Sequence, residues 1–115
     1  MMIDLNTVDA MIYTPDRWVI VDWGNPGLAI ISGWGGSYLY GASWRRSSVI
    51  THVQREDDDT FVVKTGSSVY VLRLDGIGYT SMSAGIAEKM KSTGVVVLED
   101  RESIENILNG KIQHD

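Results

Sequence analysis

The sequence contains no cysteine, so disulfides, thiolate metal sites and a cysteine nucleophile are excluded. Long apolar runs are also missing. The longest stretches, residues 27–31 and 95–98, fall far short of the ~20 residues that span a membrane. The N-terminal Met1-Met2-Ile3-Asp4 lacks the basic segment and apolar core of a signal peptide. These absences favour a cytoplasmic protein with no membrane partner.

Positive charge is scarce as well. Lys and Arg number 10 against 15 Asp and Glu, which gives a formal net charge of −5. An acidic balance repels phosphate backbones, so we do not expect direct nucleic-acid binding. The hydrophobic content of 43% is too high for a disordered chain. A length of 115 residues is that of one domain, and we expect residues 1–115 to form a single unit.

The 12 glycines mostly separate apolar runs, which is typical of strands joined by tight turns. Alternation predicts strands at residues 17–23 and 28–32, joined by a turn at 24–27. The glycines of residues 33–36 interrupt this pattern, residues 37–40 resume it briefly, and residues 41–47 form a connection. A meander of three strands follows at residues 48–55, 60–64 and 68–74.

The period changes after residue 78. Met82, Ile86 and Met90 recur every four positions, which predicts a helix with Thr80 or Ser81 as its N-cap and a stop at Gly94. We expect Met82 and Ile86 to be buried against the sheet. Residues 95–98 are fully apolar and suit an interior strand. A last helix, capped by Asp100, buries Ile104, Ile107 and Leu108 and ends at Gly110.

The expected fold class is therefore α+β. We predict a small, strongly bent antiparallel sheet of six to seven strands, ending in two short helices. Residues 4–11 are expected to form a helical turn before the first strand.

The adjacent Trp44, Arg45 and Arg46 form the first candidate binding site. An aromatic ring beside two guanidinium groups suits stacking and phosphate recognition. The alternative is a Trp packed at the edge of the core with two solvated arginines.

Two further features are candidates for partner contact. Trp34 and Tyr38 lie in a glycine-rich setting, and aromatic residues are enriched at interfaces, although they suit a small β core equally well. The second feature is an acidic hairpin tip, which could meet a basic partner surface. It consists of Glu56, Asp57, Asp58 and Asp59.

Catalytic and metal motifs are not evident. The acidic tip lacks the alternating ligand spacing of a calcium loop, and neither His52 nor His114 has a second ligand at zinc spacing. The glycine-rich residues 76–81 lack the lysine of a P-loop. We therefore expect no cofactor, no metal and no enzymatic activity.

About half of the chain follows one succession of short motifs. These are Gly24-Asn25-Pro26, then Ser47-Ser48-Val49-Ile50, then Val63-x-Thr65-x-x-Ser68-x-Tyr70-x-Leu72. In this pattern the chain resembles small accessory proteins of tailed phages and mobile elements. This resemblance implies a non-enzymatic protein in a bacterial host that binds and inhibits an anti-phage defence protein or complex.

Three hypotheses stay open at this point. The first is that inhibitor, and the second is a small-ligand binder that sequesters a nucleotide signal through Trp44, Arg45 and Arg46. The third is an enzyme of unknown reaction. A homodimer is also expected if either apolar strand, residues 28–32 or 95–98, lies at a sheet margin.

Overall fold

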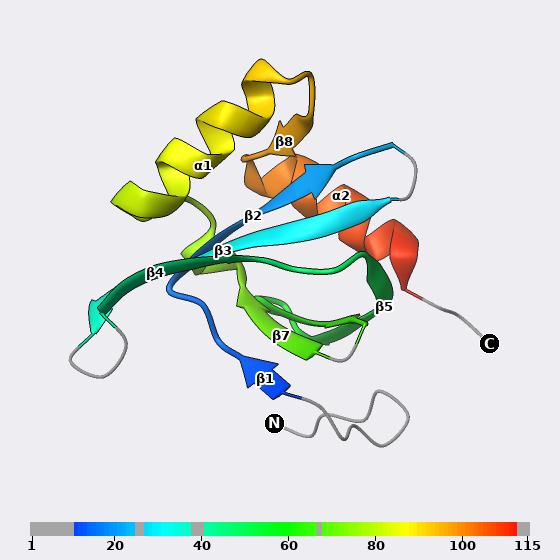
Figure 1. The fold of residues 1–115 in the computed structure, drawn as a ribbon. Coiled ribbons are helices and arrows are strands. Elements are labelled where there is room, and N and C mark those ends of the chain that lie inside the picture. The colour runs from blue at the N-terminus through cyan, green and yellow to red at the C-terminus, as the bar shows by residue number, and fades with distance from the viewer. Residues whose placement is uncertain (1–10, 25–26, 38–40, 67, 113–115) are drawn as a thin grey trace.

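The computed structural model describes residues 11–24, 27–37, 41–66 and 68–112. These residues form two four-stranded sheets and two α-helices (Figure 1), so the predicted α+β class is confirmed. The strands are β1 Met11–Tyr13, β2 Arg17–Asp22, β3 Leu28–Ser37, β4 Gly41–Arg46, β5 Ile50–Asp57, β6 Thr60–Thr65, β7 Ser68–Arg73 and β8 Val96–Leu98. A 3-10 turn, Leu74–Gly76, precedes helices α1 Ser81–Ser92 and α2 Arg101–Lys111.

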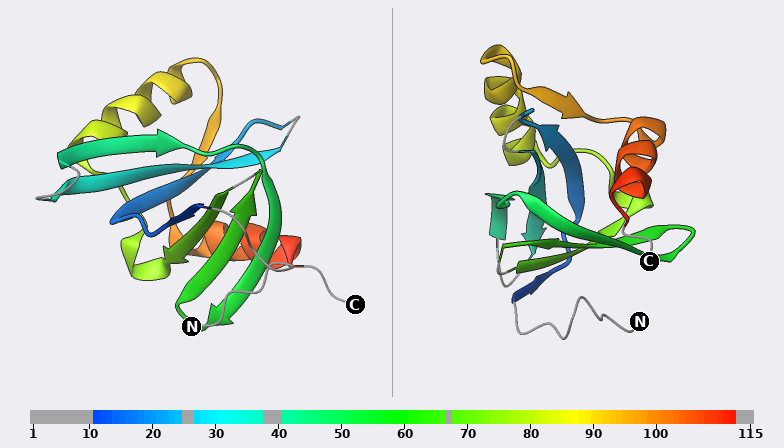
Figure 2. Two further views of the ribbon diagram at one scale, coloured as in Figure 1. Left: turned by 60° about the horizontal axis from the view of Figure 1, so that its bottom comes forward. Right: turned by 90° about the vertical axis from the view of Figure 1, so that its right-hand side faces the viewer.

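The strands divide between two sheets rather than forming the single bent sheet that the sequence predicts. Sheet A has the order β1-β7-β6-β5, and sheet B has the order β4-β3-β2-β8. The predicted meander is confirmed, because β5, β6 and β7 pair consecutively and antiparallel. The pair of β1 and β7 is parallel. The chain crosses between the sheets from β1 to β2, from β4 to β5 and, through α1, from β7 to β8. Figure 2 shows the two sheets running across one another.

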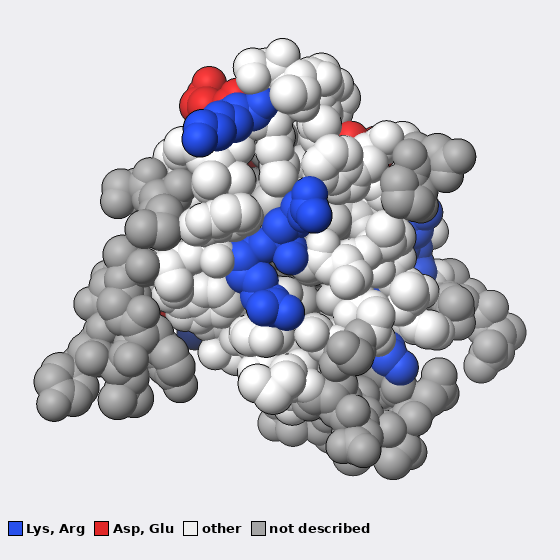
Figure 3. All heavy atoms as spheres, viewed as in Figure 1, with Lys and Arg blue, Asp and Glu red and all other residues white. Residues whose placement is uncertain are grey.

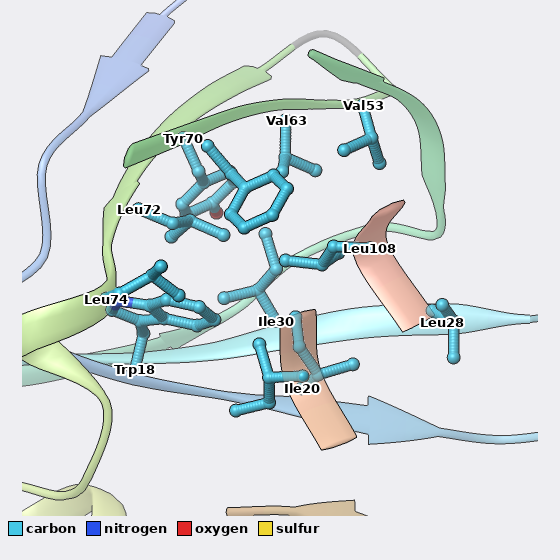
Figure 4. Packing of buried hydrophobic residues seen from close by; sticks show 12 residues of the cluster. Trp18, Ile20, Leu28, Ile30, Val53, Val63, Tyr70, Leu72, Leu74 and Leu108 are labelled. Atoms are coloured by element: carbon cyan, nitrogen blue, oxygen red, sulfur yellow. The ribbon is translucent and has the colours of Figure 1, made fainter. Parts of the chain in front are cut away.

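Strand alternation builds the main core between the sheets. The faces of β2 and β3 that carry Trp18, Ile20 and Ile30 meet the face of sheet A that carries Phe61 and Tyr70, and all five are fully buried or nearly so. Figure 4 shows the side chains of Trp18, Ile20, Ile30 and Tyr70 converging with that of Leu108 from α2. The indole N–H of Trp18 donates a 2.8 Å hydrogen bond to the Arg73 carbonyl, so this buried polar atom is satisfied.

The helices cover different parts of this sandwich. On α2, the side chains of Ile104 and Leu108 are fully buried in the main core, as predicted. Asp100 caps α2 by accepting a 2.9 Å hydrogen bond from the Ser103 N–H. Helix α1 packs on the opposite face of sheet B, where Val19 and Val21 form a second cluster (Figure 2).

Two segments that the sequence analysis treats as irregular are strands. Residues 33–36 continue β3, and residues 41–46 form β4 along its edge. Gly33 does not break the strand. The missing side chain of Gly33 allows the start of α1 to pack closely against β3, because a Cβ at this position would lie 2.6 Å from Thr80 Oγ1. Thr80 is the N-cap of α1, one of the two residues predicted for that role.

The prediction of an interior strand at residues 95–98 is wrong. Among the described strands, β8 pairs with β2 alone and forms a margin of sheet B, and Val96 is 56% exposed there. Ile86 is half-buried rather than buried. Met11 belongs to β1 and not to a helical turn; the rest of residues 4–11, like the side chain of Met82, lies outside the described part of the structure.

Candidate functional site

A hollow of about 380 Å³ opens between the margin of sheet A and the margin of sheet B. Residues 11–14, in and just after β1, line one side, and residues 43–45 of β4 line the other together with Trp34 of β3. This volume lies within the range of roughly 300–1,000 Å³ that is usual for ligand sites. It is the place where the structure gathers most of the aromatic residues that the sequence singles out.

Arg45 is fixed at this hollow by two tyrosines. Its Nε donates a 3.0 Å hydrogen bond to the Tyr70 hydroxyl, and its guanidinium carbon lies 4.7 Å from the centre of the Tyr13 ring. Tyr13 and Tyr70 stack on one another with their centroids 5.1 Å apart. Burial raises the pKa of the Tyr70 phenol above its usual value, while Arg45 acts to lower it. The phenol is thus a neutral acceptor at physiological pH, and Arg45 keeps its charge in a defined position.

Arg45 differs from Arg55, Arg73 and Arg101 in its surroundings. Arg55, Arg73 and Arg101 each contact a carboxylate. None of the ion pairs among the described residues includes Arg45 or Arg46. Figure 3 shows basic side chains near the end of β4, in the middle of one face, without acidic atoms beside them. Among the described residues, this face therefore carries positive charge that no carboxylate pairs with.

The tryptophans are placed differently from one another. Trp34 is half-buried, with its ring tilted against Tyr13 at a centroid distance of 6.0 Å. Trp44 is 38% exposed and is one of the few large apolar side chains at the surface. Trp18 belongs to the core and Trp23 packs on the second cluster. Tyr38 lies outside the described residues.

The predicted site of Trp44, Arg45 and Arg46 is split between two faces. The cross-strand partners of these residues are Gly33, Ser32 and Ile31. Because successive residues of a strand point to opposite faces, Arg45 faces the other sheet, whereas Arg46 faces the α1 side. There the guanidinium of Arg46 lies 5.6 Å from the Trp23 ring centre.

The acidic tip borders a different depression, and none of the described residues that line the hollow belongs to it. Arg55 stabilises the conformation of the tip, because its guanidinium donates hydrogen bonds of 3.0 and 2.7 Å to the main-chain carbonyls of Asp57 and Asp58. Asp59 pairs with Arg101 at 3.4 Å. Glu56 accepts a 2.9 Å hydrogen bond from Gln54. The hairpin is internally braced, with Asp57, Asp58 and Asp59 exposed.

Within the described residues, no group of three His, Asp or Glu side chains could hold a metal ion. His52 is half-buried on β5 and contacts the Thr51 hydroxyl at 3.0 Å. The glycine-rich residues 76–81 form the entry to α1, where Thr80 and Ser83 cap the helix reciprocally.

Neither Tyr13 nor Tyr70 is among the site residues predicted from the sequence. Both contribute to it through pairing between distant segments, since Tyr13 lies opposite Tyr70 in the β1–β7 register. The available signal was the alternation of Tyr70 with Leu72, which predicts an inward-facing ring but not its contact with Arg45.

Comparison with protein-family models, curated proteins and solved structures found no match to this chain. None of the helices in the described part of the chain is long and apolar enough to cross a membrane. What the protein binds is therefore inferred from the geometry of its own residues.

Proposed function

We propose that this protein is a non-enzymatic inhibitor that binds a protein of a bacterial anti-phage defence system, with the hollow between β1 and β4 as its contact site. The observation that carries the proposal is the combination of a partly exposed Trp44 with Arg45, whose guanidinium is positioned and lacks a carboxylate partner among the described residues. Trp, Tyr and Arg are the residue types that dominate binding energy at protein interfaces.

The chemistry of the hollow favours binding over catalysis. Within the described part of the chain, the titratable residues that line the hollow are Tyr13 and Arg45, and the hydroxyls of Thr14 and Ser43 lie beside them. General acid–base catalysis needs groups whose pKa values are suited to proton transfer near neutral pH, and a guanidinium is charged throughout that range. A fixed cation among aromatic rings instead favours recognition. The accessory-protein resemblance supplies the biological class of the target.

The proposal is tested by plating phage on bacterial strains that each carry one defence system. We expect the protein to restore plating on at least one strain and to bind the corresponding defence protein directly. Trp44→Ala should weaken that binding by about 2 kcal/mol or more if Trp44 is a hot spot. Asp58→Asn, in the exposed acidic tip, is the matched control for the second predicted contact surface.

An unchanged plating efficiency on every strain would count against an anti-defence role. A loss of binding with Asp58→Asn, and none with Trp44→Ala, would move the contact site from the hollow to the acidic tip.

A nucleotide binder is the second candidate, because the hollow has the volume of a ligand site and joins ring faces to one cation. Thermal unfolding with mono-, di- and cyclic nucleotides separates this candidate from the first. A ligand present at 100 times its Kd stabilises by about 2.7 kcal/mol, and this shift should disappear in Trp44→Ala.

A further inference from the structure

The hollow is lined by consecutive residues on both sides. Residues 11–14 border it on one side and residues 43–45 on the other. Successive side chains of a strand point to opposite faces, so a hollow on one face of a sheet would be lined by every second residue. Consecutive lining means that this hollow runs along the edges of β1 and β4.

Both edges are unpaired within the described part of the chain. β1 ends the order of sheet A and pairs with β7 alone, and β4 ends the order of sheet B and pairs with β3 alone. An edge strand presents a row of N–H and C=O groups that can accept another strand. β4 is the longer of the two, with six residues against three.

The side chains around β4 define what such a strand would carry. Among the described residues that line the hollow, Arg45 alone is charged, and Tyr70 and Tyr13 fix its guanidinium. Met11 and Ile12, across the hollow, are 65% and 52% exposed. A complementary segment would place a carboxylate opposite Arg45 and apolar side chains against Trp44 and Met11.

We propose that the hollow receives an extended segment of the partner protein, which pairs through its main chain with the free edge of β4 and places an acidic side chain on Arg45. This inference rests on the proposed function and specifies how the partner is recognised. Main-chain pairing provides affinity in such complexes, and pockets for alternate side chains provide specificity.

The test begins with selection of a random short-peptide library on the intact protein. Enriched peptides should carry an acidic residue flanked by apolar residues. Their affinity for Arg45→Gln should be lower by about tenfold to a hundredfold, the range of a charge-assisted hydrogen bond. Arg73→Gln, another exposed arginine outside the hollow, should bind as the wild type does.

Main-chain pairing is tested separately by methylating single peptide nitrogens in the selected sequence. Only alternate amides of an added strand bond to the edge, so methylation should abolish binding at every second position and be tolerated between them. Uniform tolerance would overturn the proposed strand pairing.

Two other outcomes would contradict the proposed recognition of an acidic extended segment. Peptides that bind through Trp44 without an acidic residue, or nucleotides that displace every selected peptide, would overturn the inference. In the first case the proposed function would stand. If neither peptides nor defence proteins show binding that depends on Trp44, the inference and the proposed function fail together.

Discussion

Tyr79 lies between helix α1 and sheet B, at the edge of the second hydrophobic cluster. Burial raises its pKa to about 12, and the carboxylate of Glu99 adds to this effect, while Lys91 opposes it. The Lys91 ammonium also pairs with Glu99 and lies 6.0 Å from the Tyr79 ring centre. The Lys91–Glu99 ion pair therefore links the end of α1 to the residue that follows β8, and the Tyr79 ring lies beside it.

The raised pKa of Tyr79 predicts alkaline destabilisation. An unfolded tyrosine ionises near pH 10, so the folded protein holds this proton more tightly than the unfolded chain between about pH 10 and 12. The stabilisation is fully present below about pH 10 and is lost as the pH rises through about 12. Tyr79→Phe should flatten the decline in the free energy of unfolding measured by urea titration across this range. Tyr70, whose pKa is also raised, should leave a residual decline; an unchanged profile in Tyr79→Phe would contradict the prediction.

Gly33 and Gly85 provide a matched pair of glycines. A Cβ at Gly33 would lie 2.6 Å from Thr80 Oγ1, whereas Gly85 in α1 has nothing within 4 Å of its Cβ position. We predict that Gly33→Ala destabilises the fold by about 1–3 kcal/mol, because overpacking displaces the N-cap of α1. Gly85→Ala should stabilise it by about 0.5–1 kcal/mol through helix propensity. Thermal unfolding measures both, and equal effects of the two changes would refute the close approach of α1 at Gly33.

At the scale of elements, local sequence patterns predicted where the strands lie more reliably than which strands pair with one another. The alternation of Trp18 and Ile20 with Val19 and Val21 predicts two opposite faces, and the structure buries both. The turn chemistry of residues 57–59 and 66 likewise predicts the meander. These features depend on residues close together in the chain.

The missed elements depend on partners far away in the chain. Residues 41–46 form β4 because β3 continues beside them, and glycines in β3 concealed that continuation. Residues 96–98 resemble an interior strand by composition, but the fold leaves one of their edges unpaired within the described residues. The hollow could not be predicted from the sequence for the same reason, because the contact of Arg45 with Tyr70 joins strands of two different sheets.

The two helices should contribute unequally to stability. Leu108 on α2 is fully buried in the main core, whereas Ile86 on α1 is half-buried. We predict that Leu108→Ala costs about 2–5 kcal/mol and Ile86→Ala less than about 2 kcal/mol, because a cavity forms only at the enclosed site. Asn106→Ala, on the exposed side of α2, is the control. Equal losses for Leu108→Ala and Ile86→Ala in urea titration would show that α1 buries its stripe as completely as α2 does.

At the scale of the whole molecule, the two margins of sheet B, formed by β4 and β8, have different surroundings. At one margin, β4 borders the hollow with its positive Arg45. At the other, β8 is a short apolar strand with an unpaired edge in the described structure, and Val96 is exposed beside it. Exposed apolar edges promote pairing with another chain, and natural proteins commonly protect them with charges or proline.

We predict that this second margin forms a homodimer. Two copies of β8 related by a two-fold axis can pair antiparallel and join their B sheets, with the same surface used on both chains. Light scattering at micromolar concentration should then give twice the 12.7 kDa mass of the chain. Val96→Lys should shift the population to monomer, because it places a charge on the edge without entering the core. Asn106→Lys adds the same charge on the exposed face of α2 and should leave the dimer intact. A wild-type mass of one chain would refute the prediction, whereas a dimer that persists in Val96→Lys would place its interface away from β8.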